Sequence, residues 1–156
     1  MPPVLDPNSV TILMADDDAE DRQLTRDALA QNHLTGDLRF VVDGEDLMDY
    51  LHQRGRWFDP ADSPRPGIIL LDLNMPRKDG REALVEIKTD PDLRQIPTVV
   101  LTSSKAEEDV VRSYMLGANS FITKPVTFTG LVEVMKTWAE YWFHASEIPP
   151  APSPGF

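Results

Sequence analysis

The fold class follows from one run of residues, Ile68-Ile69-Leu70-Leu71-Asp72-Leu73-Asn74-Met75-Pro76. Four aliphatic residues in succession are typical of a strand that is buried on both faces, as in a parallel sheet. The apolar run ends at Asp72, and Pro76 disfavours helix at the residue before it, so the backbone beside Asp72 should stay open. We therefore expect a central parallel strand at residues 68–71 with an acid at its carboxyl end.

Four other short runs have strand character, at residues 10–15, 38–42, 98–101 and 120–123. Apolar residues at helical spacing separate these runs and predict helices at residues 19–32, 45–54, 81–89, 105–116 and 127–143. Strands that alternate with helices indicate a parallel sheet covered by helices on both faces. The sequence therefore predicts an α/β fold with one doubly wound, five-stranded parallel sheet.

Length and composition fit one globular domain. The chain has 156 residues, of which 41% are hydrophobic, and this is enough for one core. We expect the domain at residues 10–143, between an N-terminal tail at residues 1–9 and a Pro-rich C-terminal tail at residues 144–156. The absence of cysteine excludes disulfides, thiolate metal sites and cysteine nucleophiles.

Charge and hydropathy restrict the partners and the location. A net charge of −11, from 26 acidic and 15 basic residues, disfavours attraction to nucleic acid phosphates. The amino terminus lacks the basic start and apolar run of a signal peptide, and no segment approaches the roughly 20 apolar residues that span a bilayer. We expect a cytoplasmic protein that binds neither membranes nor nucleic acid directly.

Four of the expected strands are followed by polar side chains: Asp16 with Asp17, then Asp72, Thr102 and Lys124. In open sheets of this class the ligand site lies just beyond the carboxyl ends of the strands, so these side chains should share one edge. Crowded carboxylates repel one another, and Mg²⁺, which prefers oxygen ligands, relieves that repulsion. Three carboxylates, one Mg²⁺ and the lysine sum to about zero charge, which suits a pocket that accepts a phosphoryl oxygen.

Asp72 is the expected nucleophile, because it follows the most apolar strand and precedes a turn that contains proline and glycine. Attack on phosphorus by a carboxylate gives an aspartyl phosphate. Thr102 can donate its hydroxyl to a phosphoryl oxygen, and Lys124 can act as a positive point charge. Each residue alone has an ordinary explanation, such as the helix cap that we expect of Asp18, and only the joint placement favours a site.

The motifs around these residues resemble the receiver domain of two-component response regulators. They are Asp16-Asp17, Leu71-Asp72-Leu73-Asn74-Met75-Pro76, Asp79-Gly80, Leu101-Thr102-Ser103 and Thr123-Lys124-Pro125. The resemblance extends over residues 10–143 and implies a flavodoxin-like (βα)5 fold. It implies a phosphoacceptor switch that catalyses only its own phosphotransfer and dephosphorylation, with a sensor histidine kinase as the partner that phosphorylates Asp72.

The resemblance also implies a metal site. Asp17 would be the main Mg²⁺ ligand, Asp16 would hold the metal through water, and Asn74 would supply its backbone carbonyl beside Asp72. Thr102 and Lys124 would bind the phosphoryl group.

Three further positions correspond to regulatory positions of the family. Phe121 stands where the family has its rotating aromatic, and Asn74 and Ser104 stand where it tunes the phosphoryl lifetime. A phosphoryl group adds about −1.5 to −2 charge, which we expect to draw Thr102 toward Asp72 and leave space for Phe121 to turn inward. The motion would change the face formed by residues 105–116, 119–123 and 127–143.

A narrower resemblance points to one kind of kinase. Residues 72–82, the long loop at residues 54–67 and the Lys124-Pro125-Val126 ending are similar to those of the small single-domain response regulators that serve phytochrome-type histidine kinases. This resemblance implies a kinase of the phytochrome type as the partner.

The last expected helix carries an aromatic group made of Trp138, Tyr141, Trp142 and Phe143. Adjacent helical residues diverge by about 100°, so the four side chains cannot all point at the core. Trp138 and Trp142 could be core residues with the others incidental. We favour an aromatic surface for a homodimer, because exposed aromatic patches often mark interfaces. The residues expected at the dimer and output face are Tyr114, Phe121, Trp138, Tyr141 and Trp142.

Two other functions compete with the phosphoacceptor switch. An aspartyl-phosphate phosphatase needs a second acid two residues after its nucleophile, and here that residue is Asn74, whose amide cannot shuttle a proton. A receiver-like module that interacts without phosphorylation usually lacks an acid or the lysine, and this chain has them all.

Overall fold

The structure is a computed structural model of the chain, and it describes residues 10–33, 37–103 and 106–142. The strands in these residues are β1 (Ile12–Ala15), β2 (Leu38–Val41), β3 (Ile68–Leu71), β4 (Thr98–Thr102) and β5 (Ser120–Thr123). The α-helices are α1 (Ala19–Gln31), α2 (Gly44–His52), α3 (Gly80–Thr89), α4 (Glu107–Met115) and α5 (Phe128–Glu140), and a short 3₁₀ helix, η2 (Gly55–Trp57), follows α2. Strands and helices alternate as the sequence predicts.

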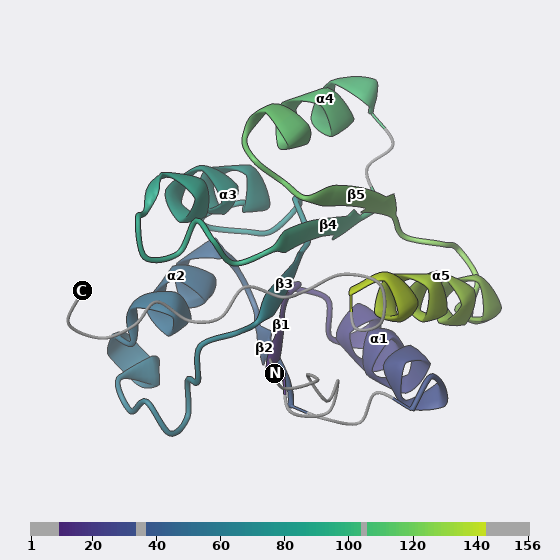
Figure 1. Cartoon of the computed structure of the whole chain (residues 1–156), viewed down its shortest axis with the longest axis horizontal. Coiled ribbons are helices and arrows are strands. Elements are labelled where there is room, and N and C mark those ends of the chain that lie inside the picture. Colours follow the sequence, from purple (N-terminus) through teal and green to yellow (C-terminus); the bar gives the residue numbers. More distant parts are fainter. Residues whose placement is uncertain (1–9, 34–36, 104–105, 143–156) are drawn as a thin grey trace, which may run out of the picture.

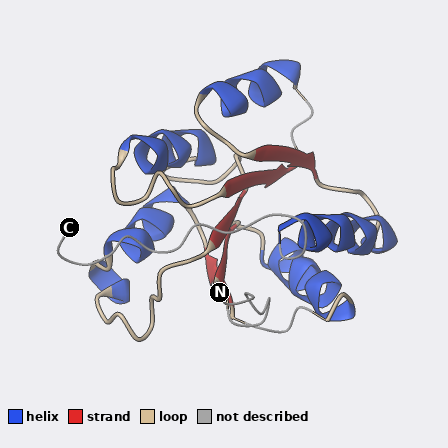
Figure 2. Cartoon of the chain, viewed as in Figure 1, coloured by secondary structure: helices blue, strands red, loops and turns tan. Residues whose placement is uncertain are grey.

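The strands form one parallel sheet in the order β2-β1-β3-β4-β5. Figure 1 shows α1 and α5 together on one face of the sheet, and α2 and α3 on the other, while α4 lies beside β5. Figure 2 shows the same layers by element type, with the strands enclosed between helices. The predicted doubly wound α/β fold is therefore confirmed.

The central strand β3 shows why the sheet is buried on both faces. All four of its side chains are buried, and successive side chains of a strand point to opposite faces. Ile69 and Leu71 accordingly join the core under α2 and α3, whereas Ile68 and Leu70 join the core under α1 and α5. The apolar run that predicts the strand thus supplies two cores at once.

Side-chain caps fix the start of most helices near the carboxyl edge of the sheet. The carboxylate of Asp18 accepts hydrogen bonds from two backbone N–H groups of α1, which confirms the predicted cap. Asp43, Asp79 and Thr127 cap α2, α3 and α5 in the same way. Helix α4 begins after Ala106 without a side-chain cap. The caps therefore help to hold the loops that lead into α1, α2, α3 and α5.

An acidic feature, which we call the Asp46 anchor, joins α2 to the loop before β3. It consists of Asp46, Arg56 and Trp57. Oδ1 of Asp46 accepts hydrogen bonds from Arg56 Nε and Trp57 Nε1, both at 2.8 Å, while Oδ2 accepts from Arg56 Nη2 at 2.5 Å and from the backbone N–H of Val42 at 3.0 Å. The guanidinium also lies over the Trp57 ring at 4.3 Å, so the long predicted loop is fixed at its start.

The aromatic group near the carboxyl end of α5 differs from the expectation. Trp138 and Trp142 have exposed fractions of 3% and 8% and belong to the core beside α1, so their assignment to an exposed dimer surface is wrong. They are four residues apart and therefore share the inward face of the helix. Tyr141 is 56% exposed, with its ring edge-on to Trp142 at 5.1 Å. Phe143 lies outside the described residues.

Some of the expectations concern residues that the structure does not describe. The tails at residues 1–9 and 144–156, and the regulatory position Ser104, lie outside the described residues. Within the part that the structure describes, no helix has the length and apolar character needed to cross a membrane.

Candidate functional site

The carboxyl ends of β1, β3, β4 and β5 meet at one edge of the sheet and form what we call the acidic pocket. Its members are Asp16, Asp17, Asp72, Thr102 and Lys124. Asp16, Asp72 and Thr102 are buried, whereas Asp17 is exposed. The predicted convergence of these side chains is therefore present in the structure.

The first turn of α3 lies directly against the backbone of Asp72. A Cβ atom at Gly80 would lie 2.1 Å from the carbonyl oxygen of Asp72, so only glycine fits there. The backbone N–H of Gly80 donates to the carbonyl of Leu73 at 2.9 Å, which closes the turn after β3. This turn positions the Asp72 carboxylate at the carboxyl end of β3.

Three groups donate hydrogen bonds to the Asp72 carboxylate. Thr102 Oγ1 donates to Oδ1 at 2.8 Å, and the backbone N–H of Asn74 donates to the same oxygen at 3.2 Å. Lys124 Nζ donates to Oδ2 at 3.2 Å. The carboxylate is thus oriented by a hydroxyl, an ammonium and a backbone amide, each from a different segment.

Lys124 is the centre of an ion-pair cluster. Its ammonium lies 2.6 Å from Asp16 Oδ2, 2.9 Å from Asp21 Oδ2 and 3.2 Å from Asp72 Oδ2. Asp21 was not among the predicted site residues. It lies in the first turn of α1, three residues after the Asp18 cap, and this position next to two strand-end acids was the signal that could have identified it.

Burial and pairing act in opposite directions on the charges of the pocket. Burial raises the pKa of Asp16 above its usual value, although the hydrogen bonds from Lys124 and the Asp18 amide act to lower it. Burial likewise acts to lower the pKa of Lys124, but the hydrogen bonds to Asp16 and Asp21 outweigh it and raise that pKa. Lys124 is therefore firmly cationic, whereas the pocket retains an excess of negative charge.

The acids of the pocket fit a hard divalent cation. One carboxylate oxygen from each of Asp16, Asp17 and Asp72 lies within 4.8 Å of the others. Such a group offers only oxygen ligands, and the exposure of Asp17 leaves room for the waters that Mg²⁺ keeps. The residues present therefore suit Mg²⁺.

The two predicted switch residues lie in different places: Thr102 is in the acidic pocket, whereas Phe121 packs against a core cluster. Phe121, in β5, is partly buried and packs against the core under α2 and α3. Its backbone N–H donates to the Tyr114 hydroxyl at 3.1 Å, so a side chain of α4 accepts a hydrogen bond from the backbone of the edge strand. Tyr114 is half exposed. Phe121 and Tyr114 thus link β5 to α4.

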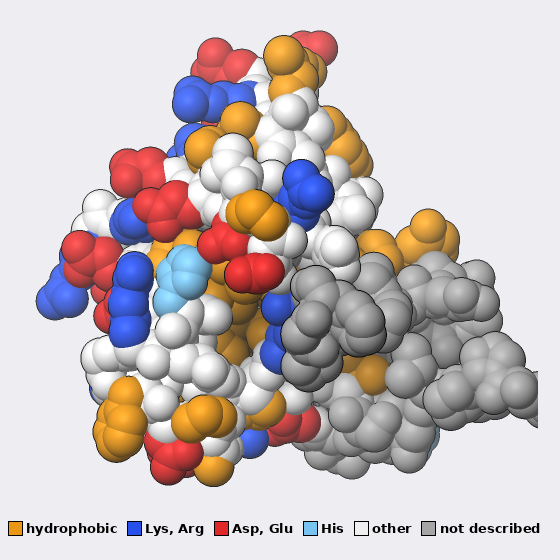
Figure 3. Space-filling view, turned by 60° about the vertical axis from the view of Figure 1, so that its left-hand side comes forward, with side chains coloured by type: hydrophobic (Ala, Val, Ile, Leu, Met, Phe, Trp, Pro, Cys, Tyr) orange, Lys and Arg blue, Asp and Glu red, His pale blue; other side chains and the backbone are white. Residues whose placement is uncertain are grey.

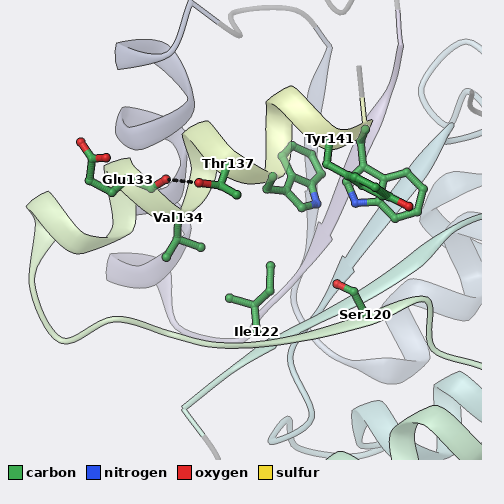
Figure 4. Close-up of a pocket in the computed structure, with 8 residues that line it drawn as sticks. Ser120, Ile122, Glu133, Val134, Thr137 and Tyr141 are labelled. Carbon is green, nitrogen blue, oxygen red and sulfur yellow. Dashed lines mark hydrogen bonds between the residues drawn. The ribbon is translucent and has the colours of Figure 1, made fainter. Parts of the chain in front are cut away.

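A groove of about 460 Å³ lies between β5 and α5 (Figure 4). Its lining is mainly apolar and shares no residue with the acidic pocket. Figure 4 shows Ile122 and Ser120 on the strand side and Val134, Thr137 and Tyr141 on the helix side. Its full lining is Ser120, Ile122, Glu133, Val134, Thr137, Trp138, Tyr141 and Trp142. The two tryptophans form its inner wall, consistent with their burial.

A different surface is presented by the side of the molecule that carries α2 and α3. Figure 3 shows acidic and basic side chains interspersed over this side, with hydrophobic side chains at its upper and lower ends and between them. Phe58, which follows η2, is 74% exposed and is a large apolar side chain far along the chain from the groove. These charges form local pairs, such as Arg54 with Asp49 at 2.7 Å.

Comparison with known proteins gives similarity over nearly the whole chain. Residues 12–136 match the family model of the response regulator receiver domain. Response regulator Rcp1 of Synechocystis sp. is 40% identical over 140 residues, which cover 90% of this chain and 93% of that protein.

Solved structures agree with the sequence comparison. The crystal structure of the phosphorylated cyanobacterial phytochrome response regulator RcpA superposes with a TM-score of 0.84 at 40% identity, over 91% of this chain and 99% of that chain. The crystal structure of the Mn²⁺-bound form of Rcp1 superposes with a TM-score of 0.82 at 39% identity, over 90% of this chain and 99% of that chain.

Proposed function

This chain belongs to the family of response regulator receiver domains, and we propose from this premise that Asp72 accepts a phosphoryl group from a sensor histidine kinase. The chain is similar to the small response regulators of phytochromes, so the proposed kinase is of the phytochrome type. The observation that carries the proposal is the Asp72 carboxylate, which is buried at a strand end and held by Thr102 and Lys124.

The proposed transfer needs little of the protein beyond positioning and charge. A carboxylate oxygen of Asp72 forms the bond to phosphorus while the phosphorus–nitrogen bond to the kinase histidine breaks, and that electron pair returns to the imidazole ring. Thr102 Oγ1 and Lys124 Nζ already contact the two carboxylate oxygens, so both can donate to the incoming phosphoryl oxygens. Hydrolysis of the aspartyl phosphate returns the chain to its starting state.

Mg²⁺ is the proposed cofactor. Asp16, Asp17 and Asp72 would hold it, with the backbone carbonyl of Asn74 as a further ligand. The bound cation would neutralise the negative charge that accumulates between the carboxylates and the phosphoryl group. A similar protein, Rcp1, has a structure with bound Mn²⁺, which supports a divalent cation here.

The proposed response to phosphorylation is a shift between two packings. Thr102 already donates to Asp72 Oδ1 at 2.8 Å and would pass this hydrogen bond to the phosphoryl group, which would favour the packing with Phe121 turned inward and change the face of α4, β5 and α5. We propose that this face mediates a homodimer through Tyr114, Phe121 and Tyr141, of which Tyr114 and Tyr141 are about half exposed. Trp138 and Trp142 would support the face from the core.

The remaining assignments follow from the family. We propose that the receiver domain covers residues 10–143, between tails at residues 1–9 and 144–156, and that it works in the cytoplasm. It would turn over no external substrate, because Asn74 stands where a phosphatase needs its second acid. A net charge of −11 argues against direct binding of nucleic acid.

Phosphorylation by acetyl phosphate tests the function directly. We expect Mg²⁺-dependent phosphorylation of the wild-type protein and a loss of at least about 100-fold in the variant Asp72→Asn, because the amide cannot attack phosphorus. The measurement is intact mass together with mobility on a phosphate-affinity gel. The control is Asp62→Asn, which changes an exposed acid in the loop between η2 and β3. Labelling that persists in Asp72→Asn excludes Asp72 as the acceptor.

Sedimentation velocity tests the dimer. We expect the phosphorylated protein to dimerise at micromolar concentration and Tyr141→Ala to weaken the dimer about tenfold, as for an aromatic side chain in an interface. The matched control is Phe58→Ala, an exposed aromatic outside this face. A protein that stays monomeric with and without the phosphoryl group contradicts the proposed dimer.

A further inference from the structure

An ion pair connects the first turn of α3 to the first turn of α4. Arg81 Nε and Nη2 donate to the two carboxylate oxygens of Asp109 at 3.0 and 2.8 Å. The side chains are 24% and 16% exposed, so solvent screens the pair only in part. Two parallel hydrogen bonds of this kind are the strongest contact that arginine makes with a carboxylate.

The same guanidinium reaches the turn that follows the phosphoacceptor. Arg81 Nη1 lies 3.5 Å from the carbonyl oxygen of Leu73, the residue after Asp72, and 3.9 Å from Asp79 Oδ2. Its pKa is raised, first by the hydrogen bonds to Asp109 and in smaller part by the charges of Asp79 and Asp72. The charge of Asp72 therefore acts on Arg81 while the guanidinium holds an acid of α4.

Helix α4 is largely exposed. Ser113 is its one buried residue, and Ala106, the described residue at its amino end, supplies no side-chain cap. Val111, Tyr114 and Met115 are exposed, with Met115 at 82%. A helix whose apolar side chains face solvent gains little from burial, so polar contacts such as the Arg81–Asp109 pair matter more for its position.

Phosphorylation changes the charge balance beside Arg81. Before transfer, the carboxylates of Asp16, Asp17, Asp21 and Asp72 with one Mg²⁺ and Lys124 sum to about −1. Afterwards a phosphoryl group of about −2 replaces the −1 of the Asp72 carboxylate, which leaves the pocket about two charges negative. An added positive charge at the pocket is then favoured. Arg81 can supply it, because its Nη1 lies 3.5 Å from the carbonyl oxygen of Leu73, the residue next to Asp72.

We propose that Arg81 is a positioning residue that exchanges Asp109 for the phosphoryl group on Asp72 and thereby releases the amino end of α4. The inference rests on the proposed phosphorylation of Asp72. It adds a second route from the pocket to α4, through the start of the helix, whereas Phe121 and Tyr114 act through β5.

Beryllofluoride, which occupies an aspartate as a stable phosphoryl mimic, provides the test. With saturating Mg²⁺, its affinity for the wild-type protein is measured by calorimetry. Arg81→Gln should weaken binding about fivefold, because a neighbouring cation is lost. Asp109→Asn should tighten it by a similar factor, because Arg81 no longer has to leave an acid. The double variant should match Arg81→Gln.

The opposite signs separate this role from a purely structural one. If the pair only held the fold together, both single variants would change affinity in the same direction, and that result overturns the proposal, as does no change in either variant. Arg81→Lys keeps the charge and should restore part of the affinity. The NMR signal of the Arg81 Nε–H group should move on beryllofluoride binding and lose its sensitivity to Asp109→Asn.

Failure of the proposed function has a different signature. If beryllofluoride does not bind the wild-type protein, or binds without moving the signals of Thr102 and Lys124, Asp72 is not a phosphoacceptor and the role of Arg81 is excluded with it. Binding at Thr102 and Lys124 with an unchanged Arg81 signal leaves the proposed function intact and excludes the exchange alone.

Discussion

Two buried acidic features of the molecule differ in how many donors each carboxylate has. In the Asp46 anchor a single carboxylate accepts four hydrogen bonds, from Arg56, Trp57 and the backbone of Val42. In the acidic pocket one ammonium, that of Lys124, is shared by Asp16, Asp21 and Asp72. The anchor is therefore complete within the chain, whereas the pocket is short of positive charge.

The directions of the pKa shifts follow this difference. Burial acts to raise the pKa of both Asp46 and Asp16. At Asp46 the hydrogen bonds from Arg56 and Trp57 outweigh burial and the pKa is lowered, whereas at Asp16 burial outweighs Lys124 and the pKa is raised. A buried acid with a full set of fixed donors holds structure together. Buried acids that share one ammonium keep negative charge that a bound metal cation can neutralise.

The largest effect on stability should come from the anchor. Asp46→Ala leaves the Trp57 indole N–H and the Val42 amide without their acceptor, and we expect the free energy of unfolding to fall by about 2–3 kcal/mol. Urea unfolding measures the loss, with Asp62→Asn as the control. The folded fraction of Asp46→Ala should still be phosphorylated at Asp72. A stability equal to that of wild type removes the structural half of the comparison.

A smaller effect of opposite sign should come from the pocket. Asp16→Asn removes a buried charge whose pKa is raised, so we expect the free energy of unfolding without Mg²⁺ to rise by about 1 kcal/mol. Added Mg²⁺ should stabilise the wild-type protein more than this variant, because a ligand that binds the folded state more tightly stabilises it more. Thermal unfolding with and without Mg²⁺ measures both. Destabilisation without metal indicates that the Lys124 contact outweighs burial.

The smallest expected effect is on the pH dependence of stability, which should also differ between the Asp46 anchor and the acidic pocket. The lowered pKa of Asp46 gives stability that is present above pH 3.8, the value for the unfolded chain, and is lost as the pH falls through the folded pKa. The raised pKa of Asp16 gives a penalty at neutral pH that shrinks as the pH falls toward 3.8. Without Mg²⁺, the difference in stability between wild type and Asp16→Asn should therefore shrink as the pH falls toward 3.8, whereas the contribution of Asp46 persists over this range.

The sequence predicted what depends on local patterns. Apolar runs identified the strands to within a few residues, and the acids at their ends identified the pocket, because parallel strands necessarily bring their carboxyl ends together. Asp21 was missed although its place in the first turn after the strand-end acids was a signal, whereas the Arg81–Asp109 pair depends on how α3 and α4 are rotated and packed against the sheet. Spacing alone does not contain that information.

The misassigned tryptophans have the same cause. Trp138 and Trp142 share one face of α5 with Met135, but only the position of α1 decides that this face is the buried one. The donors of Asp46 were also beyond prediction, because Arg56 and Trp57 reach it from a loop whose path the sequence leaves open. Tertiary contacts between non-repetitive segments account for most of what the sequence does not predict.

Binding of Mg²⁺ to the acidic pocket tests the central claim most directly. Titration calorimetry should give one Mg²⁺ site in the wild-type protein, and Asp17→Asn should weaken it by at least about tenfold, because an oxygen ligand and a negative charge are lost together. Asp17 is exposed, so its substitution should leave the fold unchanged, and Asp62→Asn should bind as wild type does. Equal affinity in the wild type and Asp17→Asn, or no binding by the wild type, contradicts the account.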